Sequence, residues 1–489
     1  MRCTHESPQT VIVRMTRGTE TRLSEFCTLN PPRNTPHSLT LFSATMMVVG
    51  NTIGVGIFTT SGVVADAVPS SGWLFVVWIL GGLLSLAGAQ AWAELGAAFP
   101  HAGGEYVYLR KAFGPFWGFL CGWAIFIANF SGSIAVLAIA LAGALAPVFA
   151  FNASHSMLWA GTLSGIPLSL SYNQLFALVL VWGVSLINYC GLLFGSGTQN
   201  VLSFSKLVAI AVLLLAGFWR GTGDWTHFSA PFQWTPTQGF LSTVGVALIP
   251  VLFAYSGWNV AAYLASEVRQ PERTLPRALL AGTLITLVVY LLLNVLYVYA
   301  VPLAALRGVV QVGELTATAL FGAKAAWIVS SLIALSIASA FNVMILAGGW
   351  IYFAMARDGV FFPSAAHLHP SFHVPGNALL MQAAWTSVLI LSGTFEQLLT
   401  YTTIVIVAFS ALTVGALFVL RVRQPDLPRP YRTWGYPWLP GFYIVASVGI
   451  ISNALWERPF ECLWGVILCV VGVPIYYWWR RVDSMKSEA

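Results

Sequence analysis

Charged side chains are scarce in this chain, and their scarcity excludes a water-soluble globular protein. Asp, Glu, Lys and Arg make up 8% of the 489 residues, whereas soluble domains carry about 25%. Hydrophobic residues reach 57%, and the mean hydropathy is +0.77. The sequence therefore predicts an integral membrane protein.

The sequence also lacks the motifs of metal, nucleotide and catalytic sites. Its six cysteines are scattered without a C-x-x-C pair, and it contains no P-loop. No cluster of His, Asp, Glu and Cys falls within the apolar segments, so we expect no metal, no cofactor and no enzymatic activity. The net charge of +6 comes from basic residues that are spread among loops, which argues against a nucleic-acid partner.

Twelve apolar segments of about 17–36 residues follow one another along the chain. Such lengths select helices, because a strand of a membrane barrel needs only about 9–11 residues. We therefore predict an all-α fold with about twelve transmembrane helices. Residues 1–37 mix Arg, Glu, Thr and Pro without periodicity, so we expect a disordered tail. The apolar segments lie at about 39–64, 72–98, 114–149, 174–190, 199–219, 237–263, 277–300, 322–355, 376–393, 397–421, 437–455 and 460–479.

The basic residues are distributed unevenly between the two sets of loops. Eighteen of the 23 Lys and Arg residues lie in the termini and in alternate loops, four lie in the opposite loops, and Lys206 lies within a segment. Because basic loops remain in the cytoplasm, this asymmetry predicts that both termini are cytoplasmic. We expect the protein in a plasma membrane.

The stretch Val49–Thr60 interrupts the first apolar segment near its middle. It carries Gly50, Gly54, Gly56 and the pair Asn51-Thr52 at a depth where a lipid-facing helix would carry Leu, Ile or Val. Glycine lets the main chain leave the helical ladder, and unwound main chain in a membrane has to be buried or line a cavity. A broken helix here would offer N–H groups to a carboxylate. Alternatively, Gly54 and Gly56 only allow a neighbouring helix to pack closely.

A second interruption, Leu252–Asn259, lies in the middle of the sixth segment and contains Ser256, Gly257 and Asn259. Breaks in the first and sixth helices are typical of two five-helix halves in inverted orientation. We therefore predict a transport core over residues 38–421, followed at 422–489 by helices eleven and twelve and the cytoplasmic C-terminus.

Several stretches together resemble the amino acid–polyamine–organocation (APC) transporter superfamily, particularly its L-type amino acid transporter branch and bacterial relatives. Each motif alone is weak, but their order and spacing together are specific. The resemblance covers nearly the whole membrane region. The stretches that carry it are Gly50–Phe58, Ala93–Tyr108, Phe253–Asn259, Glu267–Pro276, Ala354–Gly359 and Arg429–Arg432.

The resemblance implies that one amino acid binds at the two breaks. Main-chain N–H groups of Ile53 to Gly56 would hold its α-carboxylate. The carbonyls of Phe253, Ala254 and Ser256 would hold its α-ammonium, and Phe253 also matches the family's aromatic gate. The residues that we assign to the substrate site are Thr52, Ile53, Gly54, Val55, Gly56, Phe253, Ala254, Ser256, Gly257 and Asn259.

Two positions depart from the family's pattern. Val55 stands where relatives often have Ser, so its side chain offers no hydroxyl to the carboxylate. Trp350 stands where relatives commonly carry Arg, and the sequence gives no physical account of this difference.

Lys206 lies a few residues into the fifth segment, where a charge is costly and is treated as functional by default. The alternative is that its side chain extends to the cytoplasmic interface. The resemblance favours the functional role, in which the ammonium occupies the place of the sodium ion of sodium-coupled relatives and contacts the first break. Ser336 and Ser339 of the eighth segment are possible partners. We therefore predict sodium-independent transport.

These patterns together predict a secondary transporter for neutral α-amino acids that works by alternating access. Glu94 and Glu105 match the family signature around the second-to-third loop, and we expect them to fix that loop. The alternatives are a proton-coupled amino acid or amine symporter, a non-transporting nutrient receptor, and a channel. The expected partners are an amino acid and the lipid bilayer, and the sequence identifies no protein subunit.

Overall fold

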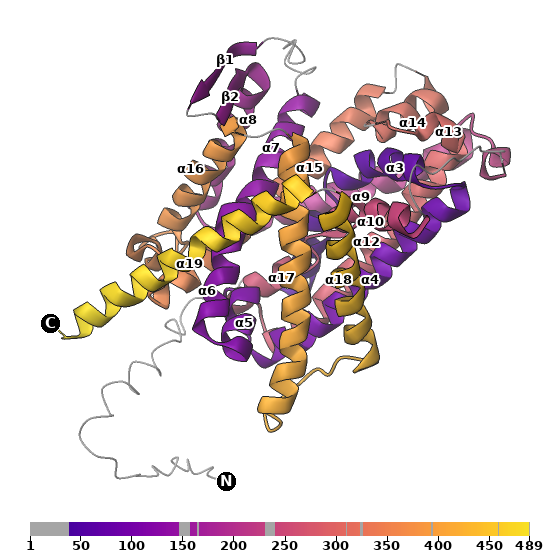
Figure 1. Ribbon diagram of the computed structural model, residues 1–489. Helices are drawn as coiled ribbons and strands as arrows, with labels where there is room; N and C mark the ends of the chain where they lie inside the picture. The colour runs from indigo at the N-terminus through magenta and orange to yellow at the C-terminus, as the bar shows by residue number, and fades with distance from the viewer. Residues whose placement is uncertain are drawn as a thin grey trace, which may run out of the picture. The chain divides into compact units, whose positions relative to one another are not determined.

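The computed structural model describes residues 39–145, 157–163, 166–229, 240–309, 311–322, 326–392, 395–457 and 459–488. These residues are nearly all helical (Figure 1). The predicted tail, residues 1–37, lies outside the described residues. Each of the twelve predicted apolar segments corresponds to one helix or to one broken helix, which confirms the predicted fold class.

The first five predicted segments form the helices from α2 to α9. The third segment is a composite, because a five-residue π-helix, η1, separates α6 from α7. A short helix, α5, precedes it. The bounds are α2 Leu41–Thr52, α3 Gly56–Ala67, α4 Ser71–Ala98, α5 Glu105–Phe113, α6 Pro115–Ala124, η1 Ile125–Asn129, α7 Phe130–Leu145, α8 Tyr172–Tyr189 and α9 Leu192–Arg220.

The remaining seven segments form the helices from α10 to α19, together with short helices in the connections. The bounds are η2 Trp225–Phe228, α10 Phe240–Tyr255, α11 Val260–Tyr263, η3 Ala265–Glu267, α12 Pro271–Ala300, α13 Leu303–Leu306, α14 Val312–Phe321, α15 Ala326–Arg357, η5 Pro363–Ala366, α16 Gly376–Ser392, α17 Phe395–Arg423, α18 Trp438–Glu457 and α19 Pro459–Glu488.

A two-stranded antiparallel hairpin before α8 was not predicted. It consists of β1 Met157–Leu163 and β2 Ile166–Ser171, with Leu163 paired to Ile166. Ser171 then caps α8 in a capping box, because its hydroxyl accepts from the Gln174 N–H while the Gln174 side chain accepts from the Ser171 N–H. This box ends the strand and starts the fourth transmembrane helix.

The two predicted interruptions are real breaks. The axis bends by 42° between α2 and α3, with Ile53 to Val55 outside both helices. The sixth segment stops as α10 at Tyr255 and resumes as α11 at Val260. Gly257 lies between them with a φ of +98°, a conformation that favours glycine.

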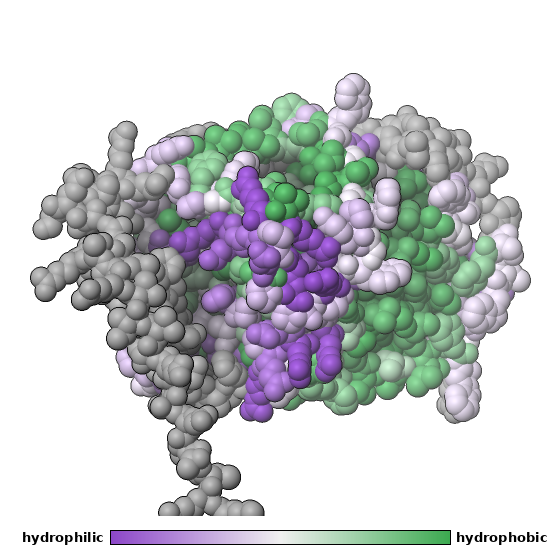
Figure 2. Space-filling view, turned by 90° about the horizontal axis from the view of Figure 1, so that it is seen from below, coloured by the Kyte–Doolittle hydropathy of each residue, from purple (hydrophilic) through white to green (hydrophobic). Residues whose placement is uncertain are grey.

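Polar and apolar surfaces are separated as a bilayer requires. Figure 2 shows hydrophilic side chains gathered on the face that carries α5 and the α17–α18 connection, with hydrophobic side chains on its flanks. We call this the α5 face. Large apolar side chains of the long helices are exposed, which suits contact with lipid. Examples are Val179, Val212, Leu215, Val445 and Val470.

Candidate substrate site

The first break presents main-chain N–H groups at the start of α3. No side chain caps this helix, whose N-cap residue is Val55. By helix geometry, the N–H groups of Gly56 and Ile57 have no partner within the helix, whereas the Phe58 N–H donates to the Val55 carbonyl at 3.1 Å. Within the break, the N–H groups of Ile53 and Gly54 already donate to the carbonyls of Val49 and Thr52, each at 2.9 Å. The N–H groups of Gly56 and Ile57 lie at the positive end of the α3 dipole, which attracts an anion.

The second break presents carbonyl groups at the end of α10. The carbonyl of Phe253 accepts from the N–H and the hydroxyl of Ser256, at 2.9 and 2.7 Å. This end of a helix carries negative partial charge, which suits an ammonium group. The two breaks therefore offer opposite electrostatic environments.

The fold brings these two breaks into direct contact. A Cβ atom added to Gly56 would lie 2.6 Å from the Cα and Cβ atoms of Ala254. The Asn51 side chain donates to the carbonyl of Gly257 at 3.2 Å. Gly56 thus serves close helix packing as well as the break, and the two interpretations of this glycine do not exclude each other.

Most of the residues assigned to the site surround this junction. Val55 and Phe253 are buried in one apolar cluster with Ile134 of α7 and Phe341 of α15. Asn259 instead donates to the Tyr263 hydroxyl at 3.1 Å, so its amide binds a neighbouring turn.

Tyr290 of α12 connects the two breaks, and the sequence did not single it out. Its hydroxyl lies 2.6 Å from the carbonyl oxygen of Thr52 and 2.7 Å from that of Ala254. One hydroxyl hydrogen is thus shared between the last turns of α2 and α10. Within the apolar run of α12, this tyrosine looks like any packing aromatic residue.

Lys206 of α9 is fully buried and does not extend to the interface. Its ammonium donates to the carbonyl oxygens of Gly50 at 2.9 Å, Ile53 at 2.6 Å and Ser336 at 3.3 Å. It therefore joins the first break to α15 through main-chain oxygens. Ser339 bonds with Gln199 and is not among these acceptors.

The two glutamates of the family signature have different surroundings. Glu94 of α4 forms ion pairs with Arg421 at 2.6 Å and Arg429 at 3.4 Å, and it accepts from the Thr433 N–H at 2.7 Å. It therefore fixes the α17–α18 connection. The expectation that Glu94 fixes the second-to-third loop is not what the structure shows, because its partners come from a distant part of the chain.

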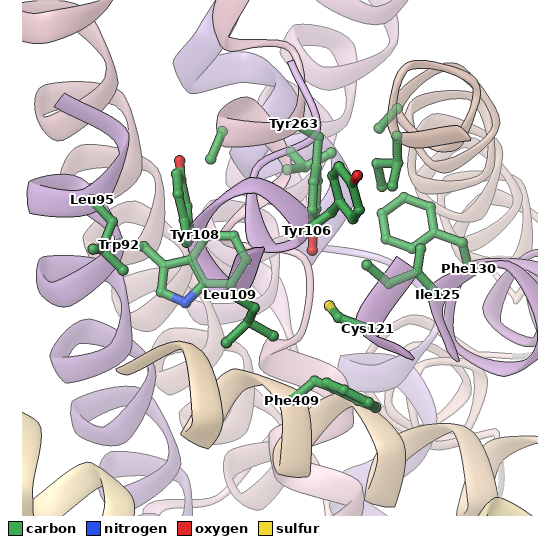
Figure 3. Close-up of a cluster of buried hydrophobic side chains, with 14 of the residues drawn as sticks. Trp92, Leu95, Tyr106, Tyr108, Leu109, Cys121, Ile125, Phe130, Tyr263 and Phe409 are labelled. Atoms are coloured by element: carbon green, nitrogen blue, oxygen red, sulfur yellow. The ribbon is translucent and has the colours of Figure 1, made fainter. Parts of the chain in front are cut away.

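Glu105 begins α5, and its buried carboxylate accepts from the hydroxyls of Tyr263 at 3.2 Å and Thr413 at 3.0 Å. Burial raises its pKa to about 7, although both hydrogen bonds favour the charged form. Figure 3 shows aromatic side chains of the surrounding cluster, including Tyr106, Tyr108 and Tyr263.

Trp350 is also buried, with its ring edge-on to Phe353, and the structure gives no reason for a tryptophan there. Among the described residues, no group of three or more His, Cys, Asp and Glu side chains could hold a metal ion.

Comparisons with known proteins identify the family of this chain. The family model described as "Amino acid permease" matches residues 39–472. The serine/threonine exchanger SteT of Bacillus subtilis (strain 168) is 30% identical over 447 residues, covering 90% of this chain and 96% of the relative. The human large neutral amino acids transporter small subunit 2 is 29% identical over 455 residues, covering 92% and 82%.

The mouse Asc-type amino acid transporter 1 is 29% identical over 454 residues, which cover 90% of this chain and 81% of the relative. These relatives are named as transporters or exchangers and not as enzymes. The family match extends over all the long helices that carry the two breaks. The chain therefore belongs to the amino acid permease family.

Proposed function

We propose that this protein carries neutral α-amino acids across a membrane by alternating access, as a secondary permease or exchanger. The observation that carries the proposal is the junction of two broken helices, one presenting N–H groups and the other presenting carbonyls. A zwitterion has one group for each. The substrate site comprises Thr52, Ile53, Gly54, Val55, Gly56, Phe253, Ala254, Ser256, Gly257 and Asn259.

Phe253 acts as the gate in this proposal. Its ring is 8% exposed and belongs to the apolar cluster beside the junction. It has to move before a bound amino acid can leave. An aromatic ring in this position excludes water while the substrate is bound. Because the ring makes no hydrogen bonds, none has to break when it moves.

The apolar surroundings support a neutral substrate side chain. Val55, Phe253, Ile134 and Phe341 share one buried cluster. A charged substrate side chain in such a cluster would need a buried countercharge. The names of the relatives, which refer to serine, threonine and large neutral amino acids, support the same class.

Transport is sodium-independent in this proposal, because the Lys206 ammonium already supplies a positive charge to the first break. It donates to three carbonyl oxygens, two of them on α2 and the adjoining break. A sodium ion at the same oxygens would meet strong like-charge repulsion.

We also propose a topology. Residues 38–421 form the inverted-repeat transport core, and residues 422–489 add helices eleven and twelve and the C-terminus. The α5 face lies on the cytoplasmic side, both termini are cytoplasmic, and the membrane is the bacterial inner membrane. The excess of Lys and Arg in the loops on this side supports the orientation.

Counterflow in proteoliposomes tests the proposed function. Vesicles loaded with unlabelled L-threonine or L-leucine should accumulate the labelled amino acid transiently and saturably, at the same rate with or without a sodium gradient. Uptake that rises steeply with the sodium gradient would contradict the role of Lys206. Binding without flux would identify a receptor, and single-channel currents would identify a pore; either result would refute the carrier.

A further inference from the structure

Buried polar side chains line the contact between α9 and α15 on the side of Lys206 toward the start of α9. Gln199 donates to the hydroxyls of Ser203 at 2.8 Å and Ser339 at 2.9 Å. The Asn342 amide donates to the Gln199 carbonyl oxygen at 3.1 Å, and Asn188 of α8 donates to Asn342 at 2.8 Å. All five side chains are at most 3% exposed. We call this group the amide seam.

The spacing of the seam is helical on both sides. On α9, Gln199, Ser203 and Lys206 lie on one face, because they are four and three residues apart. On α15, Ser339 and Asn342 are likewise three residues apart. The seam and the contact of Lys206 with Ser336 therefore form one continuous polar strip between α9 and α15.

The first half-helix rests directly on this seam. A Cβ atom added to Gly50 of α2 would overlap the Gln199 amide nitrogen and the Ser203 hydroxyl, and it would lie 2.9 Å from the Ser339 hydroxyl. The carbonyl of the same glycine accepts from Lys206. Asn200, the residue after Gln199 on α9, donates to the hydroxyl of Ser43 near the start of α2 at 3.0 Å.

A polar contact of this kind suits a surface that has to open into water. Separating two apolar surfaces in water costs about 25 cal/mol of free energy for each Å² that becomes exposed. Hydrogen-bonded amides and hydroxyls exchange their partners for water at small net cost, about 0.5–1.5 kcal/mol for each bond. When the seam is closed, few of its buried polar groups lack a hydrogen-bond partner. When it is open, water supplies the partners.

We propose that Gln199 is a positioning residue, whose amide holds the α9–α15 surface on which α2 rests. The contact between α2 and the amide seam is then a latch, which separates when the site opens toward the α5 face. The inference rests on the proposed alternating access. In it, Gln199 does not touch the substrate but sets how often α2 is released.

The test replaces Gln199 by Met, which keeps the volume and removes the hydrogen bonds. The matched control is Gln382→Met on α16, because Gln382 is also buried but its amide has no hydrogen-bond partner among the described residues. The reporter is Ser43→Cys on α2, in a background without the six native cysteines. Its rate of alkylation is measured in detergent without substrate.

Gln199→Met removes three hydrogen bonds and leaves groups of Ser203, Ser339 and Asn342 buried without this partner in the closed state. A net destabilisation of the closed state by about 1–2 kcal/mol should raise the alkylation rate about 5- to 30-fold. Gln382→Met should stay within about twofold of its parent. Equal rates in both variants, or an equal rise in both, would overturn the proposal. If Gln199→Met does not fold, Asn342→Leu, which removes the donor to the Gln199 oxygen and the acceptor of Asn188, should give a rise in the same direction, and no rise would overturn the proposal.

Counterflow separates this inference from the proposed function. With an active carrier, Gln199→Met should change the apparent KM measured from one side of the membrane more than from the other, because it shifts the balance of the two states. Equal changes from both sides would contradict the latch. If the parent protein shows no counterflow while the alkylation rates still differ, the proposed function fails, and only the role of Gln199 in holding α2 stands.

Discussion

Replacing Gly56 by Ala should impair substrate binding far more than replacing Gly54 by Ala. Both glycines lie at the first break, but their surroundings differ. A Cβ atom at Gly56 would lie 2.6 Å from the Cα atom of Ala254, whereas one at Gly54 would lie 3.4 Å from the Cβ atom of Ala340. The first distance is an overlap with main chain that cannot rotate away, and the second is near ordinary contact.

The size of the effect follows from the overlap. Non-bonded carbon atoms prefer about 3.5–4.0 Å, so Gly56→Ala has to separate the two breaks by about 1 Å. Overpacking of this kind costs about 1–3 kcal/mol, and if the bound state bears that cost, affinity falls about 5- to 150-fold. Gly54→Ala should stay within about twofold.

Titration of purified protein with L-serine, L-threonine and L-leucine, read as thermal stabilisation, measures these affinities. The double variant Gly56→Ala with Ala254→Gly should regain part of the loss, because it removes one of the two overlapping atoms. Size-exclusion profiles establish that each variant is folded. Unchanged affinity in Gly56→Ala, or an equal loss in Gly54→Ala, would refute the account of the junction.

Three further predictions concern single side chains. For Glu105, the folded protein holds a proton up to a pKa of about 7 and the unfolded chain only up to 4.5. Stability should therefore fall by about 3 kcal/mol as pH rises between these values, and Glu105→Gln should remove this slope from the Tm profile; identical profiles would contradict it. Phe253→Ala should slow counterflow more than it weakens binding, and an equal loss of both would argue against a gate. Tyr290→Phe leaves two carbonyls of the breaks without their donor, so the free energy of unfolding should fall by about 1–3 kcal/mol, and an unchanged chemical-denaturation midpoint would contradict this role.

The long helices and both breaks could be predicted because they depend on local composition. Apolar runs of membrane length leave the chain few other structures. Glycine with Ser or Asn at mid-depth marks where helix formation is weak. The breaks at Ile53–Val55 and after Tyr255 therefore follow from neighbouring residues alone.

The contacts across the sequence could not be predicted in the same way. Tyr290 and Glu94 find their partners about 240 and 330 residues away, and no local pattern states which helix faces which. The pairing of Gln199 with Ser339 has the same cause. Helical spacing shows that these polar residues share a face, but only the packing of α9 on α15 turns that face into a seam.

The most direct test of the central claim is a high-resolution structure of the protein with a bound L-amino acid such as L-threonine. The account predicts the α-carboxylate within hydrogen-bond distance of the N–H groups at Gly54 to Gly56, and the α-ammonium against the carbonyls of Phe253 and Ser256. A ligand bound elsewhere, or one whose two charged groups face side-chain charges instead of these main-chain groups, would contradict it.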